Sequence, residues 1–201
     1  YPSAISYDDF ITKNTNTTGT VYVWNSQVEM TNNQYTGTLY NSYNKAGANP
    51  ANSFDGYIPV GQGFFVQRTN NTPFVNTPFV FTDSMRRTSE SGMMSKSANV
   101  SKDRFWLEMT SPSGAKPQLL IGFFPTATSG IDQGFDATVL DASTNVLYTT
   151  VEDKKLNIDA HGSFDEGDEF SLSANLTENG TYSIGILQKE GIFNAGQKVY
   201  L

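Results

Sequence analysis

The chain has 201 residues and a formal net charge of −7, and this acidic balance excludes the basic surface that nucleic-acid binding needs. It contains no cysteine, which excludes disulfides, thiolate metal sites and thiol nucleophiles. Aromatic residues make up 13% of the chain, a content typical of a folded domain and not of a disordered one. No run approaches the roughly 18 apolar residues of a membrane helix, so we expect no membrane-spanning segment.

Period-two patterns predict strands through the first half of the chain. The segment 20–24 carries β-branched and aromatic residues, and the glycine-punctuated stretch 58–66 leads into a predicted strand at 63–68. We expect Phe65 to be a core residue of that strand. A further strand is predicted at 79–82, and the only helix is predicted at 6–12, where three apolar residues could share one face.

The second half predicts more strands. Phe105, Leu107 and Met109 alternate with polar residues and Trp106, as in a half-buried strand, and 119–124 is continuously apolar, as in a strand covered on both faces. Shorter strands are predicted at 137–140, 146–150, 156–158, 169–172, 181–187 and 198–201.

About ten strands joined by short turns predict an all-β fold with very little helix. We expect an antiparallel β-sandwich, jelly-roll-like, formed by residues 1–201 as a single region of a larger protein. The segment 83–103 has few large apolar residues and is interpreted as a long crossover loop or a seam between sub-domains.

The chain shows no constellation for catalysis. Its one histidine, His161, lies in a segment that is typical of a turn, and no G-x-S-x-G nucleophile motif is present. Paired carboxylates could serve a glycosidase or lyase, and acidic residues are plentiful, but their spacing selects no pair. We therefore expect a protein that is not an enzyme.

Asp132 and Asp136 flank a glycine in the segment 131–136. Clustered carboxylates and loop carbonyls are the ligands that calcium prefers, so the pair is a candidate structural calcium site. The alternative is that both carboxylates accept hydrogen bonds from turn amides. No other cofactor is expected.

Several aromatic residues are candidates for a binding surface. Sugars present weakly apolar C–H faces that stack on tryptophan and tyrosine, while amides and hydroxyls bind their OH groups. The candidates are Trp24, Tyr40, Tyr43 and Trp106, of which the two tyrosines flank an asparagine-rich loop. The alternative for each of them is a place in the core.

Four blocks of the chain carry a resemblance to a known family. The blocks are Gly61–Val66, Asp83–Arg86, Arg104–Leu107 and Gly134–Ala137. They resemble the β-rich C-terminal region of exported surface proteins of Bacteroidota, which precedes a type IX secretion sorting domain. The resemblance implies export and an extracellular or cell-surface location, and it implies no catalytic residue.

The resemblance also points to one modification. Asp83-Ser84-Met85 is similar to the acceptor motif for O-glycosylation in such proteins, which makes Ser84 a candidate site and the protein a candidate glycoprotein.

Three functions therefore stand as hypotheses. The first is a non-catalytic extracellular surface module for adhesion, assembly or structural display, with polysaccharide or other surface or protein subunits as partners. The second is a carbohydrate-binding module attached to a secreted polysaccharide-degrading enzyme. The third is a carboxylate-based glycosidase or lyase.

Overall fold

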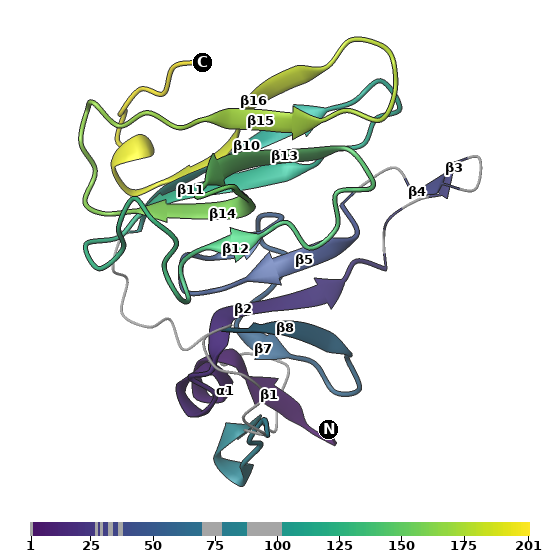
Figure 1. The fold of residues 1–201 in the computed structure, drawn as a ribbon, viewed down its shortest axis with the longest axis vertical. Coiled ribbons are helices and arrows are strands. Elements are labelled where there is room, and N and C mark those ends of the chain that lie inside the picture. Colours follow the sequence, from purple (N-terminus) through teal and green to yellow (C-terminus); the bar gives the residue numbers. More distant parts are fainter. Residues whose placement is uncertain are drawn as a thin grey trace.

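Strands form most of the regular structure of this chain. A computed structural model describes residues 2–26, 28, 30–31, 34–35, 38–69, 78–87 and 102–201. Within these residues there are sixteen strands, one α-helix and two 3-10 turns. The predicted all-β class is therefore confirmed. The strands gather in three layers, with the largest sheet at the C-terminal end and the helix at the opposite end (Figure 1).

The largest sheet is mixed, not purely antiparallel. Its strand order is β15-β13-β14-β11-β10-β16, and β12 pairs with β14 beside β13. The pair β11–β14 runs parallel, and a bulge interrupts β10–β16 at Trp106 and Leu107. The curled, mixed sheet differs from the expected jelly roll. The strand bounds are β10 (Asp103–Thr110), β11 (Gln118–Phe123), β12 (Ala137–Thr138), β13 (Val146–Val151), β14 (Lys154–His161), β15 (Leu172–Asn175) and β16 (Ser183–Glu190).

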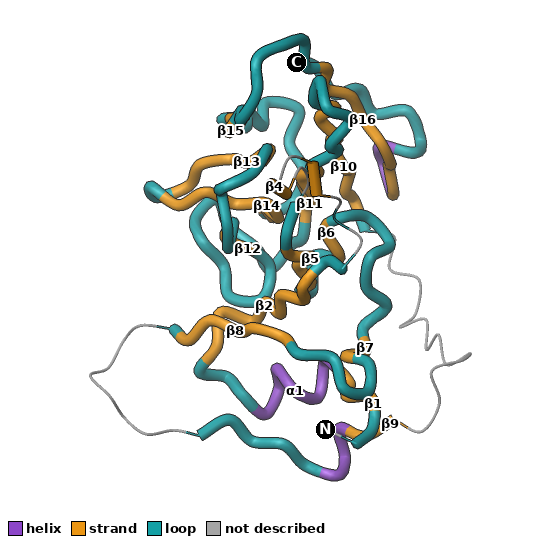
Figure 2. The backbone as a smooth tube through the Cα atoms, turned by 90° about the vertical axis from the view of Figure 1, so that its right-hand side faces the viewer, coloured by secondary structure: helices purple, strands orange, loops and turns teal. Residues whose placement is uncertain are grey.

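A four-stranded sheet lies in the middle of the molecule. Its order is β6-β5-β2-β8, all antiparallel, and the bounds are β2 (Thr17–Trp24), β5 (Tyr40–Tyr43), β6 (Ala48–Asn49) and β8 (Phe64–Arg68). One face packs on the helix layer and the other faces the large sheet (Figure 2). A small hairpin, β3 (Met30–Thr31) with β4 (Gln34–Tyr35), projects beside it.

The third layer consists of helix α1 (Tyr7–Lys13) and a small sheet of β7 (Tyr57–Ile58), β1 (Ala4–Ser6) and β9 (Arg86–Arg87). The helix matches the predicted segment. Ser6 caps it, since its hydroxyl accepts a hydrogen bond from the Asp9 amide at 3.3 Å. Phe10 is fully buried and packs edge-on against Phe64 of the middle sheet.

Four predicted segments differ from the structure. Residues 79–82 and 198–201 form no strand, and of the strand predicted at 169–172 only residue 172 belongs to one, the start of β15. The segment 83–103 does not start as a loop, because η1 (Asp83–Met85) and β9 follow each other and Met85 is fully buried. The rest of that predicted crossover, 88–101, lies outside the described residues.

The prediction that Phe65 is a core residue is wrong. Its side chain is 55% exposed, whereas its neighbours Phe64 and Val66 pack against the core between the middle sheet and α1. Both faces of this strand carry apolar residues, so alternation alone could not show which face turns toward the helix.

The middle and large sheets are joined by a buried seam. Trp106 is 2% exposed, and its indole Nε1–H donates to the Ala48 carbonyl at 2.9 Å. The amide of Asn49, 1% exposed, donates to the carbonyls of Gln118 and Asn157, both at 2.9 Å. These bonds fix strand β6 against β10, β11 and β14.

The two tryptophans of the chain give a matched test of this seam. Trp106→Ala removes a buried ring and its hydrogen bond, and we expect a loss of about 3–5 kcal/mol in unfolding free energy. Trp24 is 38% exposed and makes two edge-to-face contacts, so Trp24→Ala should cost less, about 1–2 kcal/mol. Urea unfolding of both variants measures the difference, and equal losses would contradict the buried seam.

Candidate functional site

Four aromatic side chains form a continuous row on the middle sheet and the adjacent hairpin. In order they are Tyr35, Trp24, Tyr40 and Phe65, and we call them the aromatic row. Consecutive ring centroids lie 5.5, 5.4 and 5.6 Å apart, with interplanar angles of 78°, 82° and 88°. Such edge-to-face contacts are the favoured geometry of aromatic pairs, so each ring holds its neighbour in place.

Strand register explains why the row is exposed. In the strand register Trp24 lies opposite Tyr40, and Tyr22 lies opposite Phe65. Three rings of the row and the ring of Tyr22 therefore lie on the face of the middle sheet that is directed toward the large sheet. Under the large sheet Tyr22 is 1% exposed, but Trp24 is 38% and Phe65 55% exposed. The row is thus the part of that face that the large sheet leaves uncovered.

The structure brings two of the four predicted aromatic residues together. Trp24 and Tyr40 are the centre of the row. Tyr43 lies on the opposite face, where it packs edge-on against Tyr7 at 4.7 Å, and burial raises its pKa to about 12. The prediction for Trp106 is wrong, because its ring belongs to the buried seam.

Two members of the row are not among the predicted binding residues. Phe65 was placed in the core, and Tyr35 was not selected. The signal for Phe65 was its position next to Phe64, since adjacent residues of a strand point to opposite faces. Tyr35 lies in a short hairpin opposite Met30, and no periodicity of so short a strand could place it.

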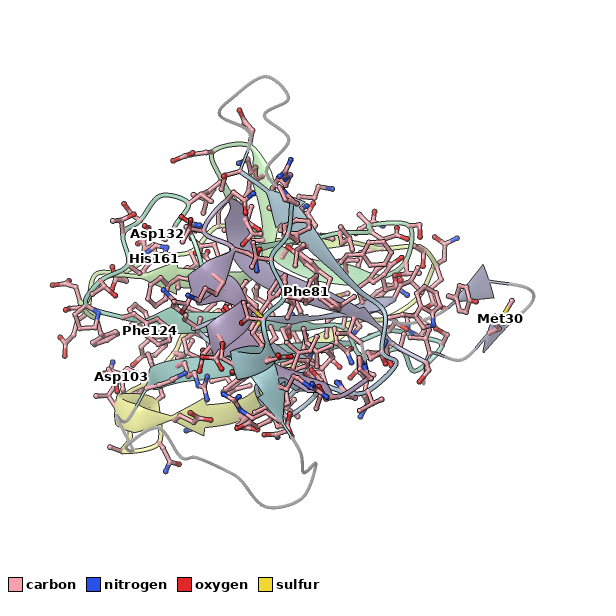
Figure 3. The ribbon with its side chains drawn as sticks, turned by 90° about the horizontal axis from the view of Figure 1, so that it is seen from below. Met30, Phe81, Asp103, Phe124, Asp132 and His161 are labelled. Carbon is pink, nitrogen blue, oxygen red and sulfur yellow. The ribbon has the colours of Figure 1, made fainter. Side chains whose placement is uncertain are left out.

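A polar groove of about 1020 Å³ lies beyond the row. Its walls come from the end of β8, the segment 131–133, β12 and the β13–β14 hairpin. Four acidic and three basic side chains line it together with amide and hydroxyl groups. Asp132 lies at one side of the molecule and Met30, in the hairpin next to the row, at the opposite side (Figure 3).

The row and the groove are both bordered by strand β8 and by the segment that contains Val139. Gln67, two residues after Phe65, lines the groove, and its Oε1 accepts a hydrogen bond from the Thr138 hydroxyl at 2.9 Å. That hydroxyl also lies 3.2 Å from the Tyr22 hydroxyl. Val139 borders both the groove and a small hollow beside Tyr40. The two features therefore form one continuous surface.

Asp132 and Asp136 are used by local backbone amides. Asp132 Oδ2 accepts from the amide and hydroxyl of Thr128, at 2.5 and 3.0 Å. Asp136 accepts from the Asp132 amide at 2.6 Å and from the Ala160 amide at 2.8 Å. In the described part of the chain, no three histidine or acidic side chains gather in a way that could hold a metal ion. This geometry favours turn capping over the predicted calcium site.

Burial changes the acidity of Asp136. The carboxyl is 5% exposed, and desolvation raises its pKa from the ordinary value of 3.8 to about 7, against the opposing effect of the two amide hydrogen bonds. The nearby Asp159 and Asp132 carboxylates also raise it.

His161 is a strand residue and not, as expected, a turn residue. It ends β14, its ring lies 4.4 Å from the ring of Phe170, and its Nε2 is 3.4 Å from Asp159 Oδ1. The Asp159 carboxylate raises the pKa of the imidazole. The described residues place no serine or threonine hydroxyl in a hydrogen bond with His161, so the pair forms no nucleophile triad there.

Ser84, the candidate glycosylation site, lies in η1. Its side chain is exposed, and its hydroxyl is 2.8 Å from the Thr82 hydroxyl. The hydroxyl is accessible to a modifying enzyme, and its modification stays a prediction.

Comparison with known proteins assigns the chain to a family without an assigned activity. Residues 1–201 match the family described as "Domain of unknown function (DUF8693)", and the chain belongs to it. No curated protein and no solved structure matches the chain. In the part of the chain that the structure describes, no helix is long and apolar enough to cross a membrane.

The raised pKa of Asp136 predicts a specific pH dependence of stability. Its folded pKa of about 7 exceeds its unfolded value, so the folded state binds the proton more tightly, and stability falls as pH rises from about 4 to about 7. Asp136→Asn should flatten this slope. Urea unfolding across the pH range measures it, and an identical slope in both proteins would contradict the assignment. The pKa of His161 is also raised, so its deprotonation also lowers stability as pH rises, but at higher pH. The change in stability below about pH 6 therefore comes from Asp136.

The amide contacts of Asp132 and Asp136 also predict the outcome of metal removal. Because backbone N–H groups already bind both carboxylates, we expect the same melting temperature with calcium and with a chelator. A rise in the melting temperature with calcium that is lost in Asp132→Asn would restore the calcium site.

Proposed function

We propose that this domain is a non-catalytic extracellular module that binds polysaccharide. The observation that carries the proposal is the aromatic row, three rings on one face of the middle sheet and a fourth on the adjacent hairpin, whose outer members are more than a third exposed. An aromatic side chain that stays exposed forgoes the free energy that burial in the core would give. A contiguous group of such side chains therefore marks an interaction surface.

The row is suited to sugars for two reasons. The C–H faces of pyranose rings are flat and weakly apolar, so they match exposed tryptophan, tyrosine and phenylalanine rings. The rings are also held in place before binding, since the centroids of neighbouring rings lie 5.4–5.6 Å apart in edge-to-face contact. A surface that is already ordered loses little conformational entropy on binding.

The polar groups around the row supply hydrogen bonds to sugar hydroxyls. The Asn25 side chain donates to the Thr38 carbonyl at 3.2 Å next to Trp24, and Asp141 borders the hollow beside Tyr40. The side-chain oxygen of Asp141 already accepts from the Ser143 amide at 2.8 Å, which orients the carboxylate. Sites that combine apolar surface with a few fixed polar groups are typical of small-molecule and sugar recognition.

The cellular setting of the proposal comes from the sequence resemblance. Export through type IX secretion would place the domain at the cell surface or in the medium, where polysaccharides are available. Within that setting the module would hold the parent protein on a polysaccharide, either as an adhesive surface module or as the binding partner of a degrading enzyme.

Affinity electrophoresis in gels that contain plant or marine polysaccharides tests the proposal. We expect at least one uncharged polysaccharide to retard the protein, and Trp24→Ala to weaken retention about tenfold, which corresponds to about 1.4 kcal/mol. Tyr200→Ala is the matched control, because Tyr200 is 82% exposed and lies outside the row. The proposal fails if no polysaccharide retards the wild-type protein, or if Trp24→Ala is retained like the control.

The same polysaccharides separate binding from catalysis. We expect no release of reducing ends from any polysaccharide that retards the protein. Release that disappears in Asp132→Asn or Asp136→Asn would replace this proposal with the glycosidase or lyase hypothesis.

A further inference from the structure

We infer that the polar groove is the continuation of the aromatic row, and that the two together bind a single extended chain of an uncharged polysaccharide. This inference rests on the proposed function. It adds a second binding site, which the sequence analysis did not select, and it narrows the ligand to a neutral chain that is longer than the row.

The aromatic row and the groove are adjacent on strand β8. Phe65 ends the aromatic row, and Gln67, the next residue on the same face of β8, already lines the groove. Successive residues on one face of a strand are about 6–7 Å apart, a distance that a single sugar unit can bridge. A chain that stacks on Phe65 therefore reaches the Gln67 amide with its next unit.

The polar groups that line the groove can hydrogen-bond to sugar hydroxyls. Its lining offers an amide at Gln67, a hydroxyl at Thr69 and an ammonium group at Lys154. Groups of this kind, donors and acceptors in near balance, match the many hydroxyls of a sugar chain.

Charge decides between neutral and anionic chains. The groove has no excess of basic groups, since four acidic and three basic side chains line it, and the whole chain carries a net charge of −7. A polyuronate or a sulfated chain would bring further negative charge into the groove and toward Asp132. The balance therefore favours an uncharged polysaccharide.

Size is consistent with a chain of several units. The groove volume of about 1020 Å³ lies at the upper end of the range for ligand sites, and its openness to solvent allows a polymer to pass through instead of ending inside. Asp132 in the groove and the hairpin of Met30 beside the row mark opposite sides of the molecule (Figure 3), so the path crosses most of it.

The test uses a series of uncharged oligosaccharides of increasing length from the polysaccharide that retards the protein. Isothermal titration calorimetry gives the affinity of each for the wild-type protein and for Gln67→Ala/Lys154→Ala. The matched control is Gln197→Ala/Lys198→Ala, which removes the same two side-chain types near the C-terminal end of the chain, outside the groove. Thr138 keeps the Tyr22 hydroxyl as a partner in the groove variant, so the fold should be preserved.

We expect wild-type affinity to rise with chain length until the oligosaccharide spans both features. The groove variant should bind the shortest members like wild type and the longest members about tenfold more weakly, as expected for the loss of one or two hydrogen bonds. The control should match wild type at every length.

The outcomes separate the inference from the proposed function. If the groove variant matches wild type for the longest chains while Trp24→Ala has lost binding, the groove inference is overturned and the proposed function stands. If wild type binds no member of the series and no polysaccharide retards it, the proposed function fails as well. Tighter binding of a polyuronate than of the neutral chain would overturn the choice of ligand.

Discussion

Strand β6, which consists of Ala48 and Asn49, is the point on which the rest of the structure depends. Asn49 donates from one amide to the carbonyls of Gln118 and Asn157, which belong to two neighbouring strands of the large sheet. Trp106 binds the preceding residue, Ala48, from a third strand. The bonds to the Asn157 and Ala48 carbonyls are buried and the bond to the Gln118 carbonyl is partly buried. An unpaired buried polar group costs about 1–3 kcal/mol, so these bonds favour one position of the middle sheet against the large sheet.

A second contact fixes the other end of the same interface. Gly19 and Gly134 approach so closely that a Cβ on Gly19 would lie 2.5 Å from the Gly134 Cα, and both residues have φ near +80°. Glycine alone fits both requirements. Gln133 donates to the Thr15 and Thr17 carbonyls in the same region. The segment 131–134 is thereby held against the start of β2, and this contact forms one wall of the polar groove.

These two contacts explain why aromatic side chains remain exposed. They set the large sheet over Tyr22 and Ser42 but not over Trp24 and Phe65, although all four lie on one face of the middle sheet. The aromatic row and the groove are then the two uncovered ends of that interface. The candidate binding surface is largely a consequence of how the sheets are placed, with the β3–β4 hairpin and the segment 131–133 at its two ends.

The sequence predicted local structure better than it predicted which faces are covered. Ser6 and the apolar positions after it indicated the helix, and the alternation around Leu107 indicated β10, because both signals are local. Whether Trp106 or Phe65 is buried depends on a partner sheet far away in sequence. The parallel pairing of β11 with β14 is also a long-range feature, since 30 or more residues separate the paired positions. Trp24 and Tyr40 were predicted as binding residues, and that role stays a prediction; the contacts that join Trp24 to Tyr40 and Tyr40 to Phe65 follow from strand register.

We propose that the exposed Trp24 contacts the ligand, whereas the buried Trp106 joins the two sheets. The indole N–H signals of the two tryptophans in an NMR spectrum, assigned with Trp24→Phe, distinguish these roles during titration with an oligosaccharide of the polysaccharide that retards the protein. We expect the Trp24 signal to shift on binding and the Trp106 signal, whose N–H is hydrogen-bonded to Ala48, to stay in place. A shift of the Trp106 signal with an unchanged Trp24 signal would contradict this proposal.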